Sequence, residues 1–187
     1  MTVIAAVVKN GECAIAGDRR ISWGGTYAEG DPKVHDKGAA LVGRAGSPMF
    51  ARYVRTYPNL VVPEGGLTRE VSEAWVVGLA EGARKWADER GHGVSEGRSK
   101  KYDLTLVIAT PVGLWDCSGD GAVVHIPGGV WAQGSGASEA MGAMHALRDA
   151  ELTLRELAGK AAMTAIALDV NCGDGIDVLS ILNEETS

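Results

Sequence analysis

The chain has 187 residues, of which 45% are hydrophobic and 22% are charged, and its formal net charge is −6. These values fit one globular domain over residues 1–187 with a substantial core. The negative charge argues against nucleic-acid binding, and no apolar run reaches the roughly 18 residues of a membrane span. The three cysteines are scattered and no secretory leader is recognisable, so we expect a cytoplasmic protein.

Two apolar runs open the chain, and they flank Asn10-Gly11. VIAAVV covers residues 3–8, and CAIAG covers residues 13–17. An Asn-Gly pair between two such runs is the strongest short-range signal of a β-hairpin. This hairpin would carry the second strand back toward Thr2 and would place Asp18 close to it.

The following segments predict a second pair of strands and then two helices. The strands are expected at 33–35 and 39–45. Ser47-Pro48 supplies an N-cap and a proline at the first position of a short helix. Thr68 begins a longer helix, which ends near Gly91. Its predicted core-facing stripe consists of Val71, Trp75, Leu79 and Trp86.

The rest of the chain repeats this order. Residues 94–101 are polar and are expected to form a surface loop. LTLVIA, LWDCS, AVVHI and VWAQ then predict an antiparallel meander, followed by a helix at about 138–147. Thr153 and Glu156 form a capping box before a helix whose apolar face carries Leu157, Ala161 and Leu168. A last strand is expected at 176–182. Strands, helices, strands, helices and a strand predict an α+β sandwich and not a parallel βαβ fold.

Several familiar motifs fail on inspection. Gly134-Ser135-Gly136 begins like a dinucleotide fingerprint, but Glu139 stands where the third glycine belongs. Residues 169–175 resemble a calcium loop only faintly, because two ligand positions and the required glycine hold other residues. The histidines show no metal-binding spacing and the cysteines form no CxxC pair, so we expect no catalytic metal.

The start of the chain carries the remaining chemistry. A second residue as small as Thr2 normally allows Met1 to be removed, which would leave Thr2 with a free α-amino group beside its hydroxyl. One residue then supplies both a nucleophile and a base, as in N-terminal threonine catalysis. If Met1 were retained, the Thr2 nitrogen would stay in a peptide bond and this chemistry would be lost.

Five features follow one another in a recognisable order. They are Thr2, Asp18 in AIAGD, Lys33 in DPKV, a glycine in LVGRAG, and Gly134-Ser135-Gly136 before a helix. This order resembles the proteasome β-subunit family, and within it the bacterial HslV-type peptidases, over almost the whole chain. The resemblance implies the N-terminal nucleophile hydrolase fold, a four-layer αββα sandwich of two antiparallel sheets flanked by helices.

The resemblance also implies a role for each residue. Thr2 would be the nucleophile of a threonine endopeptidase, and Ser135 would hydrogen-bond to its amine. Gly43, in VGRAG, would supply the N–H of the oxyanion hole. Asp18 would hold Lys33 in place and keep it charged. A nearby ammonium group favours the neutral form of the terminal amine, which has an ordinary pKa of about 8.

A turn near the end of the chain completes the comparison. Asp169 and Cys172, in DVNCG, resemble the family's Asp-x-x-Ser-Gly turn, with Cys in place of Ser. By the same resemblance a structural monovalent cation is expected around 169–173, and the chemistry itself should need no cofactor. Arg19 and Arg20 depart from the family pattern, which expects smaller or less charged residues after Asp18.

The resemblance further implies a self-compartmentalised assembly. An HslV-like subunit would form a homo-oligomeric ring, expected as a double hexamer, and would receive unfolded polypeptide from an ATP-dependent unfoldase. Two alternatives stay open. One is an N-terminal-nucleophile amidase that acts on a small amide and needs no ring. The other is an inactive, structural ring subunit, which retention of Met1 would favour.

Overall fold

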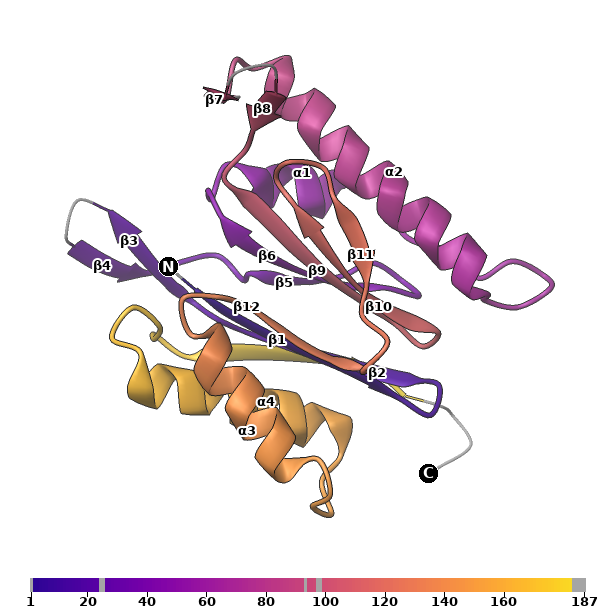
Figure 1. Cartoon of the computed structure of the whole chain (residues 1–187), viewed down its shortest axis with the longest axis vertical. Coiled ribbons are helices and arrows are strands. Elements are labelled where there is room, and N and C mark those ends of the chain that lie inside the picture. Colours follow the sequence, from indigo (N-terminus) through magenta and orange to yellow (C-terminus); the bar gives the residue numbers. More distant parts are fainter. Residues whose placement is uncertain (1, 24–25, 93, 97–98, 183–187) are drawn as a thin grey trace.

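The computed structural model describes every residue except 1, 24–25, 93, 97–98 and 183–187. Two helices, a five-stranded sheet, a four-stranded sheet and two further helices follow one another through the molecule (Figure 1). The strands within each sheet are antiparallel. The predicted four-layer αββα sandwich is therefore confirmed.

The four-stranded sheet is built around the first hairpin. Its strand order is β12-β1-β2-β13. Asn10 and Gly11 connect β1 to β2 with φ angles of 55° and 78°, which suit Asn-Gly and few other pairs. The predicted hairpin is thus confirmed. The bounds are Val3–Lys9 for β1, Glu12–Asp18 for β2, Val130–Gly134 for β12 and Ile176–Ile181 for β13.

The five-stranded sheet has the order β11-β10-β9-β6-β5. The predicted meander is correct for its first three strands and wrong for the fourth, because β12 crosses to the other sheet and pairs with β1. The chain crosses to the other sheet after Ile126. Beyond this point, Val8 N–H donates to Gly129 O at 2.7 Å. The bounds are Val34–Asp36 for β5, Leu41–Gly46 for β6, Leu104–Thr110 for β9, Gly113–Ser118 for β10 and Val123–His125 for β11.

Helices α1 (Phe50–Thr56) and α2 (Arg69–Asp88) cover the five-stranded sheet, and α3 (Ala137–Leu147) and α4 (Leu154–Leu168) cover the four-stranded sheet (Figure 1). Thr68 caps α2 by accepting from Val71 N–H, and the Thr153–Glu156 capping box is present. Helix α1 begins later than predicted. Ser47 O and Pro48 O accept from the amides three residues on, so a tight turn precedes the helix.

Three details of the helical and loop predictions are wrong. The buried face of α2 carries Val76, Leu79, Ala80, Ala83 and Ala87, whereas Val71 is exposed and Trp75 and Trp86 are only partly buried. Leu168, at the end of α4, is 69% exposed. Residues expected as a loop form strands β7 (Val94–Glu96) and β8 (Ser99–Lys101).

A second short hairpin, not predicted, follows Asp18. Its strands are β3 (Arg20–Trp23) and β4 (Thr26–Glu29), and it extends from the end of the sandwich that carries Thr2 (Figure 1). The residues at its turn, 24–25, lie outside the described part of the chain. Arg20 is the first residue of β3.

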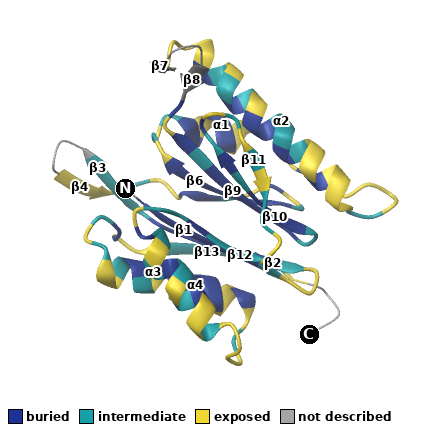
Figure 2. Ribbon diagram, in the orientation of Figure 1, coloured by how far each residue is buried: buried dark blue, intermediate teal, exposed yellow. Residues whose placement is uncertain are grey.

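Apolar side chains fill each interface of the stack. Ile4, Ile15, Leu41 and Val107 belong to the cluster between the sheets. Figure 2 shows the helices buried on the sides that face the sheets and exposed on their outer sides. Among the described helices, none has both the length and the apolar character needed to cross a membrane.

Candidate active site

Thr2 lies directly before β1, with 4% of its surface exposed, against the Gly134-Ser135-Gly136 segment that links β12 to α3. Thr2 N lies 3.3 Å from Ser135 Oγ, and Gly136 N–H donates to Thr2 O at 3.3 Å. Gly134 has a φ of 98°, and a Cβ there would lie 2.0 Å from Thr2 O. The segment therefore needs glycine to hold the Thr2 backbone this closely.

Asp18 ends β2 beside Thr2 and is fully buried. Its Oδ1 accepts from Val3 N–H at 3.0 Å and from Lys33 Nζ at 2.8 Å. Its Oδ2 accepts from Gly173 N–H at 3.2 Å and from Arg20 N–H at 3.3 Å. One carboxylate thus fixes the residue after Thr2, the lysine and the turn after α4, which satisfies the rule that buried charges are hydrogen-bonded.

Lys33 lies just before β5 and is 4% exposed. Burial lowers the pKa of its ammonium group, although the charge of Asp18 and the hydrogen bond to it act in the opposite direction. The charge of Arg44 lowers this pKa further. The structure therefore brings Thr2, Asp18, Lys33 and Ser135 together from four separate segments.

Gly43 lies elsewhere. It occupies the middle of β6, opposite Val34 and Val107, and a Cβ there would lie 2.4 Å from Ile4 Cγ2, so it allows the two sheets to approach. Arg44 N–H donates toward β5, to Lys33 O at 2.9 Å. Because successive residues of a strand direct their N–H groups to opposite neighbours, Gly43 directs its own toward β9. Gly43 does not line the pocket at Thr2.

Gly46, the second glycine of LVGRAG, does line that pocket. It has a φ of 93°, and a Cβ there would lie 2.5 Å from Asp103 O. The Gly46 N–H points to the same side of β6 as the Arg44 N–H. Strand β5 begins at Val34, opposite Gly43, so Gly46 lies past the end of β5. The resemblance pointed to Gly43, and Gly46, at the end of β6 two residues before Pro48, was not among the predicted site residues.

The turn after α4 approaches the site from the other side. Cys172 Sγ lies 3.8 Å from Ser135 Oγ and 3.4 Å from Asp169 Oδ2. Hydrogen bonds from the Ser135 side chain and the Asn171 backbone lower the pKa of Asp169. Burial raises the pKa of the Cys172 thiol to about 12, so the thiol is neutral and a poor nucleophile.

Several oxygen atoms of this turn accept hydrogen bonds from within the chain. Arg20 Nη1 donates to Val170 O at 2.7 Å, and Asp169 Oδ1 accepts from the Asn171 backbone and side chain. These contacts tie Arg20 to the turn, and the structural cation expected at 169–173 stays a prediction. Among the described residues, no three His, Cys, Asp or Glu side chains are grouped as metal ligands would be.

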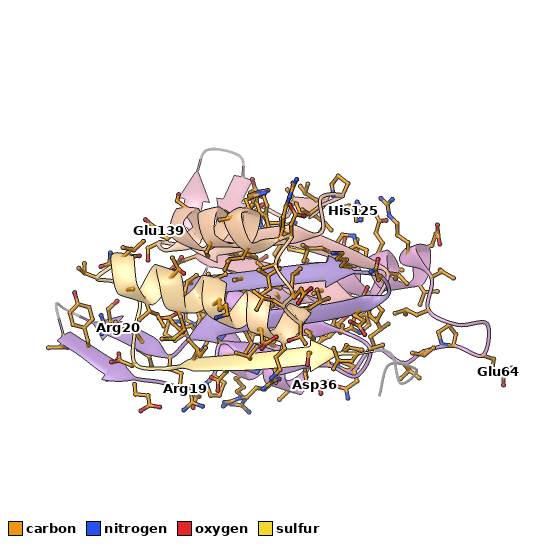
Figure 3. The ribbon with its side chains drawn as sticks, turned by 90° about the horizontal axis from the view of Figure 1, so that it is seen from below. Arg19, Arg20, Asp36, Glu64, His125 and Glu139 are labelled. Atoms are coloured by element: carbon orange, nitrogen blue, oxygen red, sulfur yellow. The ribbon has the colours of Figure 1, made fainter. Side chains whose placement is uncertain are left out.

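A small pocket opens at Thr2. The residues that line it are Thr2, Arg20, Ile21, Ser22, Lys33, Arg44, Gly46 and Pro48. Arg20 pairs with Asp174 at 3.0 Å, and Arg19 pairs with Asp177 and Glu29. Figure 3 shows both arginines at the end of the molecule that carries the β3–β4 hairpin. A larger pocket, lined by Val8, Met144 and Arg148 among others, contains none of the predicted site residues.

The comparisons with known proteins concern the fold. No protein-family model matches the chain. It is similar to the structure of Thiobacillus denitrificans BPH, with a TM-score of 0.77 and 22% sequence identity over 96% of this chain and 97% of that one. BPH in complex with epoxomicin gives a TM-score of 0.77 and 21% identity over 96% and 98% of the two chains. Eukaryotic HslV from Trypanosoma brucei gives 0.69 and 21% over 96% and 98%.

The chain has the HslV fold. The match spans nearly the whole of both chains, so the order of all major elements is shared. This likeness confirms the resemblance to HslV-type peptidases and the N-terminal nucleophile hydrolase fold that the resemblance implied. At 21–22% identity the likeness concerns the fold, and the chemistry is argued from the residues of this chain.

Proposed function

We propose that this protein is a threonine endopeptidase of the proteasome type, with Thr2 as its nucleophile after removal of Met1. The observation that carries the proposal is the position of Thr2. Its nitrogen lies 3.3 Å from Ser135 Oγ, and the residue after it is tied to the buried Asp18–Lys33 ion pair. A nucleophile next to its own base, with an oriented cation nearby, meets the requirements of covalent catalysis.

The reaction begins with the neutral Thr2 amine accepting the hydroxyl proton, directly or through a water, while Oγ attacks the peptide carbonyl. The tetrahedral intermediate then breaks its C–N bond. The departing amine takes the proton from the Thr2 ammonium, and an ester on Oγ remains. Water attacks this ester by the same route in reverse, releasing the new carboxylate and restoring the Thr2 hydroxyl and amine.

Lys33 and Asp18 prepare the amine for this cycle. The Lys33 ammonium disfavours a second positive charge on the amine and so keeps it available as a base at neutral pH. Asp18 holds that ammonium group at 2.8 Å. It also accepts from Val3 N–H, which fixes the backbone where Thr2 joins β1. Ser135 orients the amine and can pass a proton to or from it.

We assign the oxyanion hole to the Gly46 N–H in place of Gly43. Gly46 lines the pocket with Thr2, and its N–H extends beyond the last pairing with β5. Gly43 lies within the sheet, under Ile4. Removal of one oxyanion donor costs about 3 kcal/mol of transition-state stabilisation in other enzymes.

Two considerations support the assignment to threonine peptidases and the assembly into a ring. Epoxomicin, which occupies BPH in one of the similar structures, is a peptide epoxyketone, a group that reacts with a hydroxyl and an amine on one residue. An unselective peptidase also has to be enclosed to be tolerated in a cell. We therefore propose a homo-oligomeric ring, a double hexamer, that is fed with unfolded polypeptide by an ATP-dependent unfoldase.

The test starts with the intact mass of the purified protein, which shows whether Thr2 is the first residue. The processed protein should hydrolyse short fluorogenic peptides, Thr2→Ala should abolish hydrolysis, and Thr2→Ser should retain part of it. A peptide epoxyketone should add its mass to the N-terminal peptide of the parent protein and not to that of Thr2→Ala.

The alternatives give different results. Hydrolysis of small amides by a protein that forms no ring would support the amidase. A ring that retains Met1 and is inert would support the structural subunit. Undiminished peptide cleavage by a correctly assembled Thr2→Ala ring would end the proposal of an N-terminal nucleophile.

A further inference from the structure

A separate cavity lies at the end of the sandwich opposite to Thr2. Strand β1 begins beside Thr2 at Val3 and ends at Lys9, and its seven residues span about 20 Å. The cavity opens next to the end of β1 and has a volume of about 260 Å³. Figure 1 shows the β1–β2 turn and the α3–α4 connection at this end, away from the N-terminus. No catalytic step proposed above uses the cavity.

The floor of the cavity is apolar. Four buried side chains line it, and they come from β1, α3 and α4: Val7, Met144, Leu154 and Leu157. Gly128, before β12, also lines the cavity, and a Cβ there would have no neighbour within 4 Å. Well-packed interiors contain few voids larger than a water molecule. The chain thus leaves room here that its own side chains do not fill.

Cations stand at the mouth of this cavity. Lys9, His145 and Arg148 line it, and all three are exposed. Among the described lining residues one carboxylate is present, that of Asp149, and it lies 3.4 Å from Arg148 Nε. Within the described part of the chain, Lys9 forms no ion pair. One positive charge at the mouth therefore has no counterion.

The helix ends at the cavity do not alter this balance. Helix α3 ends at Leu147 and α4 begins at Leu154, and both residues line the cavity. The C-terminal end of a helix carries a partial negative charge and the N-terminal end a partial positive charge, so the two effects offset each other. Because the whole chain has a net charge of −6, the cationic mouth is a local feature.

An apolar floor beneath one unmatched positive charge fits a ligand that has an apolar chain and a single negative charge. Carboxylates form charge-assisted hydrogen bonds with lysine and arginine. A water-sized group takes about 30 Å³, so the cavity holds a chain of about six to eight carbon atoms. We propose that this cavity binds a monocarboxylate with a short apolar chain, the chain lying against Met144 and the carboxylate at Lys9 and Arg148. A free fatty acid and the apolar C-terminal residue of a peptide share this chemistry.

A methionine methyl group can report binding at the cavity itself. The assembled protein, labelled with ¹³C at its methionine methyl groups, is titrated with hexanoate, butanoate or hexanamide and followed by NMR, and Met144→Leu assigns the Met144 signal. Hexanoate should shift this signal and not that of Met163, which lines a different pocket. Its Kd should be about tenfold lower than that of butanoate, because two more methylene groups are buried. It should be about fivefold lower than that of uncharged hexanamide, because exposed ion pairs contribute modestly.

Lys9→Met/Arg148→Met should reduce the affinity for hexanoate to that for hexanamide. Arg155→Met is the matched control, because Arg155 is an exposed cation at the start of α4 that does not line the cavity. It should keep the difference between the two ligands. N-acetyl-leucine and N-acetyl-leucinamide extend the test to a peptide end. Tighter binding of N-acetyl-leucine than of hexanoate indicates a peptide C-terminus as the ligand, and weaker binding indicates a free fatty acid.

Two results would overturn the proposal. One is a Met144 signal that neither hexanoate nor N-acetyl-leucine shifts. The other is equal affinity of each acid and its amide for the parent protein. Neither result bears on the proposed peptidase, because Thr2 lies at the other end of β1 and its activity is measured separately.

Discussion

The two helix-covered faces of the sandwich are packed with different kinds of side chain. Beneath α3 and α4 the cluster is rich in alanine, including Ala5, Ala16, Ala161 and Ala165. Beneath α1 and α2 it contains large aromatic residues, among them Phe50, Tyr53, Tyr102 and Trp115, with Trp75 and Trp86 packed against them. Both faces cover a buried sheet, and the alanine-rich face supports the Thr2 backbone through Gly136.

This difference indicates that one face positions Thr2 and that the other contributes more to the stability of the fold. Small residues let α4 and the turn after it approach the start of α3 closely: a Cβ on Gly136 would lie 2.8 Å from Ala165 Cβ and 2.9 Å from Cys172 Sγ. Gly136 in turn donates to Thr2 O. The aromatic face buries more apolar volume per residue, so it should contribute more to the free energy of unfolding. The following predictions test this division, from the largest expected effect to the smallest.

Lys33→Ala should abolish peptidase activity and leave the ring assembled. Lys33 lies just before β5 of the five-stranded sheet and lines the pocket together with Thr2, so its loss tests whether the site needs both faces. Lys33→Arg should also fail, because a larger planar group is not interchangeable with an ammonium at a tight site. The measurement is turnover of a fluorogenic peptide, together with size-exclusion chromatography.

Lys37→Ala provides the control. Lys37 is also buried, but it donates to Arg55 O and Tyr57 O at the end of α1 and does not line the pocket. It should lower stability and keep the activity of the folded fraction. Near-normal turnover in Lys33→Ala would show that the ammonium group is dispensable.

Trp115→Ala should reduce the free energy of unfolding by about 3–5 kcal/mol, as truncations of buried tryptophan do. Trp115 is fully buried in the aromatic cluster, where its ring packs edge-on against His125. Denaturant titration measures the loss. Below the unfolding temperature the specific activity should stay close to that of the parent. A large fall in activity of the fully folded variant would contradict the division between the two faces.

Ala165→Leu should have a smaller effect on stability and a larger one on chemistry. Overpacking a filled core costs about 1–3 kcal/mol. The longer side chain would push on Gly136 and so displace the backbone that holds Thr2, and kcat should fall at least tenfold. Ala143→Leu, on a partly buried position of α3, is the control and should leave kcat unchanged. Equal kinetics in the two variants would contradict the close approach as a requirement.

His35 should make stability depend on acid pH. Burial, and then the charges of Arg44, Lys37 and Arg55, lower the pKa of His35 to about 4. The folded-state pKa lies below the ordinary value, so the unfolded chain takes up the proton first as the pH falls. Stability should therefore be complete above about pH 6.5 and decrease from there to about pH 4.

His35→Gln should flatten this part of the pH profile, whereas replacement of the exposed His92 by Gln should not. Thermal unfolding between pH 4 and pH 7 measures both. An identical slope in the parent and in His35→Gln would show that other groups cause the acid sensitivity.

Much of the fold could be predicted because it depends on local chemistry. Asn10-Gly11 and the Thr153 capping box act within a few residues, and both are present as expected. The crossing of β12 to the other sheet was not predictable, since VWAQ has the same alternation whichever sheet it joins. The face of α2 was misjudged because Trp75 and Trp86 flank the core and do not fill it.

The site shows the same limit. Asp18 follows from the length of the first hairpin, and the resemblance supplied Lys33 and Ser135. The choice between Gly43 and Gly46 depends on which neighbour each N–H faces, and this is a property of strand pairing.

The contacts of Asp18 have a consequence for the timing of synthesis. A ribosome makes β1 and β2 early, but Asp18 Oδ2 gains the Gly173 N–H only when that residue has been made, and β13 then pairs with β2. A nascent chain that already exposes Thr2 thus lacks part of the framework that orients it. If Thr2 is the nucleophile, its orientation through Asp18 is completed late in synthesis. A newly made subunit then cannot attack neighbouring nascent chains before the subunit itself is nearly complete.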